Sequence, residues 1–211
     1  MDGMQRGWNL IAQDDYAAAE QSFRAVLADP ETINTQRYEA RFGLGYCLAH
    51  TGNVDDARDI YTQLRHEARA GASALPEHVV LHQIGMVERL AGDWEAAARC
   101  FQEERTMIEG LGNDPLAVAI NAYELGFVAL HLGHTEESKT HFEESLESAW
   151  RTTDSITLGC AHRGLGDWHA KYGERSEALR HWAAAERAFT SAGADSAVQD
   201  IQERWTRHAE P

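Results

Sequence analysis

The sequence predicts an all-α solenoid made of stacked helix–turn–helix repeats, because two signals recur along the chain with the same period. The first signal is an apolar residue followed by glycine, which returns after 40, 41 and 40 residues, at Leu44-Gly45, Ile84-Gly85, Leu125-Gly126 and Leu165-Gly166. The second is a glycine placed seven residues after the first one, at Gly52, Gly92, Gly133 and Gly173. A period in this range is typical of stacked supersecondary units rather than of one globular core.

Each apolar-glycine pair lies inside a stretch with helical spacing, and the second glycine is placed to end that helix. A glycine inside a helix costs about 1 kcal/mol relative to alanine, so its recurrence predicts that another helix crosses closely there. Small residues recur in the stretch that follows, at Ala57, Ala97, Ser138 and Ala178. An aromatic residue comes four positions after each of them and is expected to wedge against the next repeat, at Tyr61, Phe101, Phe142 and Trp182.

This series of residues resembles the tetratricopeptide repeat (TPR) family. It matches best at Gln13-Asp14-Asp15-Tyr16 with Ala19, Phe23 and Pro30, and at Gly92-Asp93-Trp94 with Ala97 and Phe101. The resemblance implies a right-handed α-solenoid of five TPR-like repeats with a C-terminal capping helix, in a single domain over residues 1–211. The period of 40–41 residues is longer than the family's common period of about 34, so each helix is expected to be almost a turn longer.

The five repeats are predicted at about residues 1–30, 34–70, 75–110, 114–151 and 154–191, followed by a capping helix at 195–208. Prolines suit the first helical turn and aspartates suit the N-cap, and these start signals are Pro76, Pro115, Asp114 and Asp154. Helix ends are predicted at the glycines Gly71, Gly110, Gly112 and Gly193. The last segment is amphipathic, with one apolar face formed by Val198, Ile201 and Trp205, as a cap needs.

Composition excludes several classes of function. The net charge of −15 and the pI near 5.1 argue against binding to nucleic acids or to anionic membranes. There is no run of 18 apolar residues and no apolar N-terminal leader, so we expect neither a membrane span nor a secretion signal. Cys47, Cys100 and Cys160 form no CxxC pair and are interpreted as small buried apolar residues. A cytoplasmic location is expected.

No catalytic or cofactor-binding motif is evident, so the chain is predicted not to be an enzyme and to need no cofactor. Histidines occur in pairs on predicted helices, but HExxH, CxxC and EF-hand patterns are absent, and no metal site is predicted. His162 and His169 fall where the repeat places packing aromatics, and we interpret them as structural. The glycines around Leu44 and Leu165 lie inside helices without a preceding strand, so they are interpreted as close-packing residues.

The resemblance implies that the first helix of each repeat lines a concave groove that binds peptides or helices. The corresponding residues here are Met4, Trp8, Phe42, Tyr46, His82, Met86, Arg89, Tyr123, Phe127, His131, Arg163, Asp167 and Lys171. The basic residues of the family's carboxylate clamp are mostly absent, which argues against a receptor for chaperone tails. The aromatic and methionine side chains favour an apolar peptide or helix, and Arg163 and Lys171 are placed to bind a carboxylate. The alternative is that the aromatics only pack between helices.

The sequence therefore favours a non-enzymatic scaffold that binds a protein or peptide, such as an apolar helix, in its concave groove. Two alternatives stay open. One is a signal-sensing regulatory domain that binds a small peptide or ligand, which rests on the long period alone. The other is a self-associating module that forms a homo-oligomer through the first repeat, which has no N-terminal cap of its own.

Overall fold

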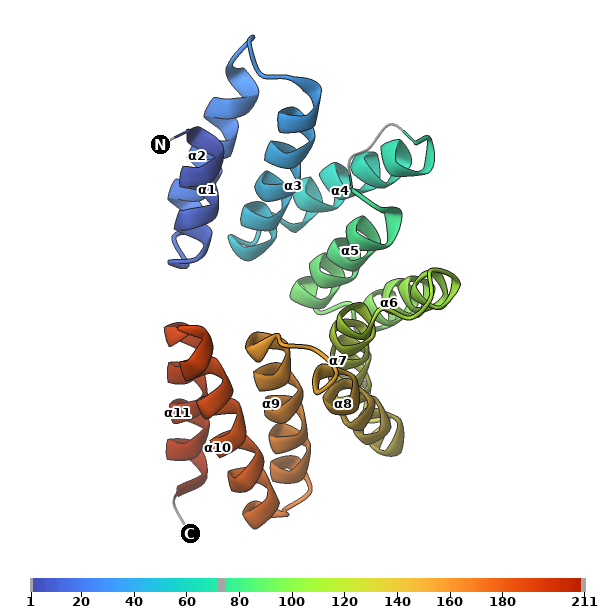
Figure 1. Cartoon of the computed structure of the whole chain (residues 1–211), viewed down its shortest axis with the longest axis vertical. Helices are drawn as coiled ribbons and strands as arrows, with labels where there is room; N and C mark the ends of the chain where they lie inside the picture. Colours follow the sequence, from blue (N-terminus) through green and yellow to red (C-terminus); the bar gives the residue numbers. More distant parts are fainter. Residues whose placement is uncertain (1, 72–74, 210–211) are drawn as a thin grey trace. The chain divides into compact units, whose positions relative to one another are not determined.

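The computed structural model describes residues 2–71 and 75–209, which form eleven α-helices and no strand. The helices are α1 (Gly3–Ile11), α2 (Tyr16–Ala28), α3 (Asn34–His50), α4 (Val54–Arg69), α5 (Glu77–Ala91), α6 (Trp94–Gly110), α7 (Pro115–Leu132), α8 (Thr135–Ala149), α9 (Ser155–Lys171), α10 (Arg175–Ala192) and α11 (Asp195–Ala209). The prediction of an all-α helical repeat fold is confirmed (Figure 1).

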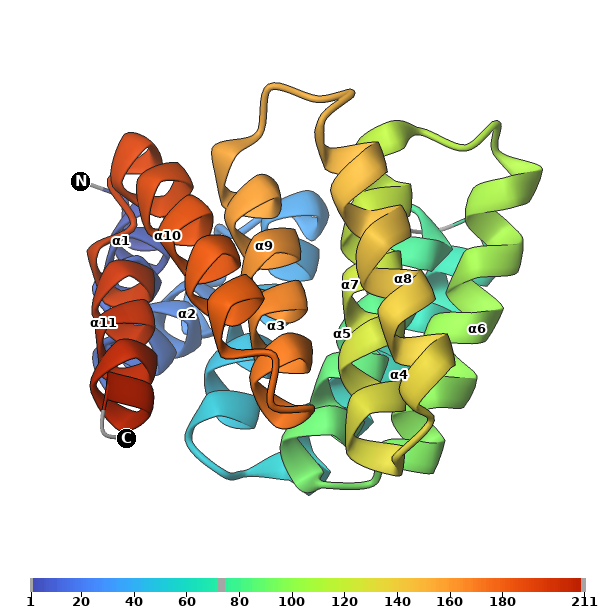
Figure 2. The ribbon, with the colours of Figure 1, turned by 90° about the horizontal axis from the view of Figure 1, so that it is seen from below.

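The helices belong to two compact units, and the boundary between Glu104 and Arg105 falls inside α6. In unit 1, α1 packs on α2, α2 on α3, α3 on α4 and α4 on α5, while α3 also contacts both α1 and α5. In unit 2, α7 packs on α8, α8 on α9, α9 on α10 and α10 on α11, and α7 also contacts α9. Figures 1 and 2 both show α9, α10 and α11 side by side, in orange to red. Each helix thus packs mainly on its neighbours in sequence, as repeat folds do.

The predicted turn glycines end the first helices of four repeats. Gly52, Gly92, Gly133 and Gly173 all have positive φ, between 78° and 85°. Glycine adopts this left-handed conformation without the penalty that a β-carbon imposes. The chain can therefore reverse within a few residues, which brings the end of one helix beside the start of the next.

The mid-helix glycines make room for aromatic rings rather than only for small residues. A β-carbon on Gly126 would lie 2.7 Å from the ring of Phe142, and one on Gly85 would lie 2.6 Å from Phe101. Phe142 also fills the space in front of Gly164, in the middle of α9 in the following repeat. The ring is thus held between its own repeat and the next one, as the sequence predicted, and a glycine on each side makes room for it.

Helix starts agree with the capping signals at three of four positions. Asp114 accepts a hydrogen bond from the backbone N–H of Ala117 at 3.0 Å, and Asp154 accepts one from Thr157 at 2.6 Å. Pro115 occupies the first turn of α7. Pro76 instead lies at the N-cap of α5, one residue before the helix begins, because its ψ of 148° is extended rather than helical.

The C-terminal helix α11 covers α10 with only part of its apolar face. Ile201 is fully buried in a cluster with Trp182 and Phe189, and Val198 is half-buried against it. Trp205, which the sequence places on the same face, is 39% exposed. The core contact of α11 is therefore centred on Ile201.

Helix α7 is, by length and composition, apolar enough to cross a membrane, although the sequence contains no uninterrupted apolar run of that length. Among the described residues it is the one helix that meets this test, and 56% of it is buried inside the protein. Asn121 and Glu124 lie on it and are themselves buried. A core helix surrounded by others meets the same test, and α7 is such a helix, since it packs on both α8 and α9 in unit 2.

Candidate functional site

The first helices of unit 1 carry four large apolar side chains from the predicted groove that are half-buried rather than enclosed. Trp8 lies on α1, Phe42 and Tyr46 lie on α3, and Met86 lies on α5. Because α3 contacts both α1 and α5, the helices that carry these side chains are adjacent. We call Trp8, Phe42, Tyr46 and Met86 the aromatic face of unit 1.

Rings of the second helices brace this face from behind. The ring of Trp8 meets that of Phe23 edge-on, with centroids 5.2 Å apart. Phe42 meets Tyr61 in the same way at 5.5 Å, and the Tyr61 hydroxyl donates a hydrogen bond to the Phe42 carbonyl at 2.9 Å. Phe23 and Tyr61 are fully buried, so the two outer rings rest on a fixed base.

At the ends of α3 and α5, polar groups surround Tyr46. The His50 ring stacks on Tyr16 with centroids 4.5 Å apart and lies 4.4 Å from Tyr46. Burial lowers the pKa of His50, and the positive charge of Arg89 lowers it further. Burial also raises the pKa of Tyr46, which Arg89 partly opposes. Arg89 thus acts on both side chains, which places the end of α5 close to the end of α3.

Two further predicted groove residues of unit 1 lie deeper. Met4 is only 7% exposed and belongs to the core. The Nδ1 atom of His82 lies 3.1 Å from a carboxylate oxygen of the buried Glu104, and its ring lies 5.5 Å from that of Phe101. These two side chains serve packing within unit 1.

In unit 2 the predicted groove residues are graded from buried to exposed along α7. Tyr123 is buried, Phe127 is half-buried and His131 is exposed. The rings of Phe127 and His131 lie 4.4 Å apart, and the Nδ1 atom of His131 is 2.8 Å from the Phe127 carbonyl oxygen. The aromatic surface is therefore smaller here than in unit 1.

The polar groove residues of α9 have partners inside unit 2. Arg163 donates to the Tyr123 hydroxyl at 2.7 Å and pairs with Asp200 at 3.2 Å. Lys171 donates to the Leu130 carbonyl at 2.6 Å. A ligand carboxylate, which the sequence suggested as the partner of Arg163 and Lys171, would have to compete with these contacts.

Asp167 is tied to the C-terminal helix. It accepts hydrogen bonds from Arg204 at 2.7 and 3.1 Å and from the Trp182 indole N–H at 2.9 Å. The repeat pattern does not reveal the partners of Arg163 and Asp167, because Asp200 and Arg204 lie on α11, outside the repeats. The sequence does contain a signal for them, since Asp200 and Arg204 lie one turn apart on the predicted capping helix.

One group of side chains in the described part of the chain has the composition of a metal site, namely His169, Glu177 and His181. Sequence motifs missed it, because its residues follow no standard spacing and come from two helices. Glu177 and His181 are four residues apart on α10, and that spacing is the feature of the sequence that could have indicated the group.

Burial lowers the pKa of His181 to about 4, and it lowers the pKa of the adjacent His162 to about 4 as well. Both rings are therefore neutral at pH 7.

The three cysteines are free and carry no clustered chemistry. Cys47 is buried, as the sequence predicted, while Cys100 and Cys160 are half-buried. Burial raises the pKa of Cys47 to about 12 and that of Cys100 to about 11. Neither of these two thiols is set up as a nucleophile at neutral pH.

Two family models described as tetratricopeptide repeat match residues 4–73 and 76–149, which together make up more than half of the chain. The chain therefore belongs to the tetratricopeptide repeat family. A comparison with curated proteins gave no match.

Solved structures show the same fold at low sequence identity. BtubC (BKLC) from P. vanneervenii has a TM-score of 0.62 and 13% identity, covering 93% of this chain and 89% of that one. A putative kinesin light chain from Podosopora anserina, with nearly identical TPR-like repeats, has a TM-score of 0.62 and 13% identity, covering 90% and 94%. PilF from Pseudomonas aeruginosa has a TM-score of 0.59 and 15% identity, covering 97% and 89%. The family and the fold indicate a protein-interaction scaffold in general terms.

Proposed function

We propose that this chain is a non-catalytic scaffold that binds an apolar peptide or helix on the aromatic face of unit 1. The observation that carries the proposal is the half-burial of Trp8, Phe42, Tyr46 and Met86 on three adjacent helices. Side chains that only pack between helices are enclosed, as Phe23 and Tyr61 are. Side chains that stay partly open on a firm base are typical of recognition surfaces.

The bracing of this face favours binding energetically. Ordering a flexible side chain at an interface costs about 0.5–1.5 kcal/mol. The edge-on contacts of Trp8 with Phe23 and of Phe42 with Tyr61 already restrict the two outer rings. Because folding has already ordered these rings, binding loses less side-chain entropy, and more of the free energy of apolar burial remains for affinity.

The chemistry of the face defines the partner. Its four side chains are apolar or aromatic, so they match a peptide that presents apolar residues at helical spacing. Methionine adapts its shape to different apolar surfaces, and Met86 gives the face that property on α5. Asp14 and Arg89 both act on Tyr46, so that end of the face carries charges of both signs and does not select the charge of the peptide.

The proposal is tested with the full chain immobilised and a display library of helical peptides. Selected peptides are then measured by fluorescence anisotropy against Trp8→Ala and Tyr46→Ala. We expect each substitution to weaken binding by tenfold or more, because truncating a central aromatic costs about 2 kcal/mol. Trp150→Ala is the matched control, since Trp150 follows α8 in unit 2, is 67% exposed and lies outside the face.

Circular dichroism establishes that the variants keep their helix content. If Trp8→Ala and Tyr46→Ala bind the selected peptides as the wild type does, the aromatic face is not the binding site. Loss of binding in Trp150→Ala would count against it equally, because it would place the contact elsewhere.

A further inference from the structure

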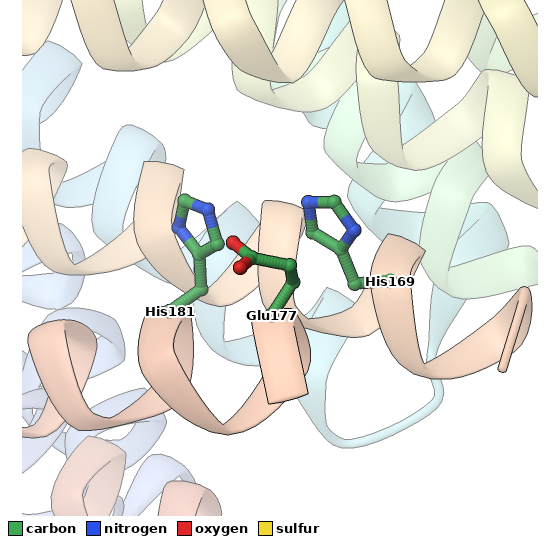
Figure 3. A group of neighbouring side chains, drawn as sticks. All are labelled: His169, Glu177 and His181. Carbon is green, nitrogen blue, oxygen red and sulfur yellow. The ribbon is translucent and has the colours of Figure 1, made fainter. Parts of the chain in front are cut away.

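Two histidines and one glutamate converge where α9 turns into α10. His169 lies in the last turn of α9, while Glu177 and His181 lie one turn apart at the start of α10. One ligand atom from each residue lies within 4.8 Å of the others. Figure 3 shows the carboxylate of Glu177 between the two imidazole rings. The short turn through Gly173 brings the two helix ends together, so the backbone itself sets this spacing.

Hydrogen bonds to Nδ1 orient both rings. Nδ1 of His169 lies 2.7 Å from a carboxylate oxygen of Glu174 and donates to it, so Nε2 is the nitrogen left for a metal ion. Nδ1 of His181 lies 3.0 Å from Nδ1 of His162. Histidines that bind metals commonly have such an outer partner, which fixes the tautomer and the ring orientation.

A positive group already lies between two of the three side chains. Nη2 of Arg180 is 2.6 Å from the Glu177 carboxylate and 3.2 Å from Nε2 of His181. A guanidinium only donates, so Nε2 of His181 must be an acceptor and its Nδ1–H must point to His162. The lone pairs of Glu177 and His181 are thus directed at one cation. The Arg180 side chain is 65% exposed, so it can move into solvent.

We propose that His169, Glu177 and His181 bind a divalent transition metal ion, with Zn²⁺ as the ion that this donor set suits best. Two imidazoles and one carboxylate are ligands that Zn²⁺ accepts, and three protein ligands leave a further position for water. The ion takes the place of the Arg180 guanidinium. It thereby links the last turn of α9 to the first turn of α10.

The test uses the full chain without a histidine tag, treated with a chelator and then titrated with Zn²⁺ by calorimetry. Co²⁺ serves as a second probe, because its visible absorption reports coordination. We expect one ion per chain, and Glu177→Gln weakens binding by about tenfold or more. Glu177 is 46% exposed, so its replacement by glutamine keeps the fold.

Glu137→Gln is the matched control, because Glu137 on α8 of the same unit also lies near two histidines. His134 and His141 approach its carboxylate at 3.3 and 3.8 Å. This variant is expected to bind Zn²⁺ as the wild type does. If it loses as much affinity as Glu177→Gln, the metal binds the acidic surface in general and the proposal is overturned.

Arg180→Ala gives a test that loss of structure cannot imitate. Removing the competing positive charge is expected to tighten Zn²⁺ binding by about fivefold. Zn²⁺ should also raise the melting temperature of the wild type but not that of Glu177→Gln, because an ion that binds only the folded state stabilises it. Weaker binding by Arg180→Ala, or a wild type that binds neither Zn²⁺ nor Co²⁺ at 1:1 stoichiometry, overturns the proposal.

Discussion

The guanidinium of Arg163 on α9 lies over the ring of Tyr123 on α7, with Cζ 5.5 Å from the ring centroid, and donates to its hydroxyl at 2.7 Å. The same guanidinium pairs with Asp200 on α11 at 3.2 Å. One side chain therefore joins three helices of unit 2. This arrangement makes Arg163 a structural link between repeats and cap.

Arg163→Ala is expected to lower the free energy of unfolding by about 2 kcal/mol, because hydrogen bonds to a charged partner contribute about 1.5–3 kcal/mol each when partly buried. Urea unfolding followed by tryptophan fluorescence measures the change. Arg151→Ala, at an exposed position, serves as the control and should stay within about 0.5 kcal/mol of the wild type. A wild-type unfolding curve for Arg163→Ala would contradict the structural role.

Gly126→Ala tests the accommodation of the Phe142 ring. Alanine would favour the helix by about 1 kcal/mol, but its β-carbon would lie 2.7 Å from the ring, and overpacking of this kind costs about 1–3 kcal/mol. We expect net destabilisation in thermal unfolding. Gly110→Ala, at the end of α6 with nothing near the added carbon, is expected to be neutral or slightly stabilising. Equal effects at the two positions would show that packing at Gly126 is unimportant.

Thiol labelling tests the burial of the cysteines. With the pKa of Cys47 raised to about 12 and that of Cys100 to about 11, the thiolate fraction at pH 8 is at least about a hundredfold below that of a free cysteine with pKa near 8.5. We expect slow reaction of the native protein with Ellman's reagent at these two positions, and Cys47 slower than Cys100. Fast labelling in guanidinium provides the control, and mass spectrometry assigns the sites.

His50 is expected to make the protein less stable as the pH falls below about 6.5. Its pKa in the folded state is lowered by burial and by Arg89, whereas the unfolded chain keeps the ordinary value near 6.5. Below that pH the unfolded state binds the proton first, so stability is complete above it and is lost on acidification. In an NMR titration, the imidazole signal missing from His50→Gln should have its midpoint below 6.5. A midpoint above that value would contradict the effect of burial.

The sequence predicted the elements that repeat and missed the contacts that occur once. Gly92 and Gly133 mark helix ends because their positive φ is a local property of the backbone that does not depend on distant contacts. Phe142 was predicted from spacing alone, since every repeat has the same need for a large ring at that position. These features are local or periodic, so one sequence contains enough information to place them.

The partners of Arg163 and Asp167 depend on α11, which no repeat pattern describes. Asp200 and Arg204 reach them across 37 residues of sequence. Likewise, whether Tyr46 is open or enclosed depends on how α3 meets α1 and α5, and spacing along one helix does not determine that. The convergence of His169 with Glu177 and His181 depends on the detailed geometry of a single turn.

The position of Phe142 between Gly126 and Gly164 has a consequence for how the chain tolerates change. The ring packs on two repeats at once, so packing continues across the repeat boundary that the sequence places near residue 153. Shortening the protein there would expose the side of the ring that packs on Gly164, and a repeat inserted there would need a glycine at the matching place. The matching places before Gly85 and Gly126 hold Gln83 and Glu124, so the repeats of this chain are not interchangeable at this junction.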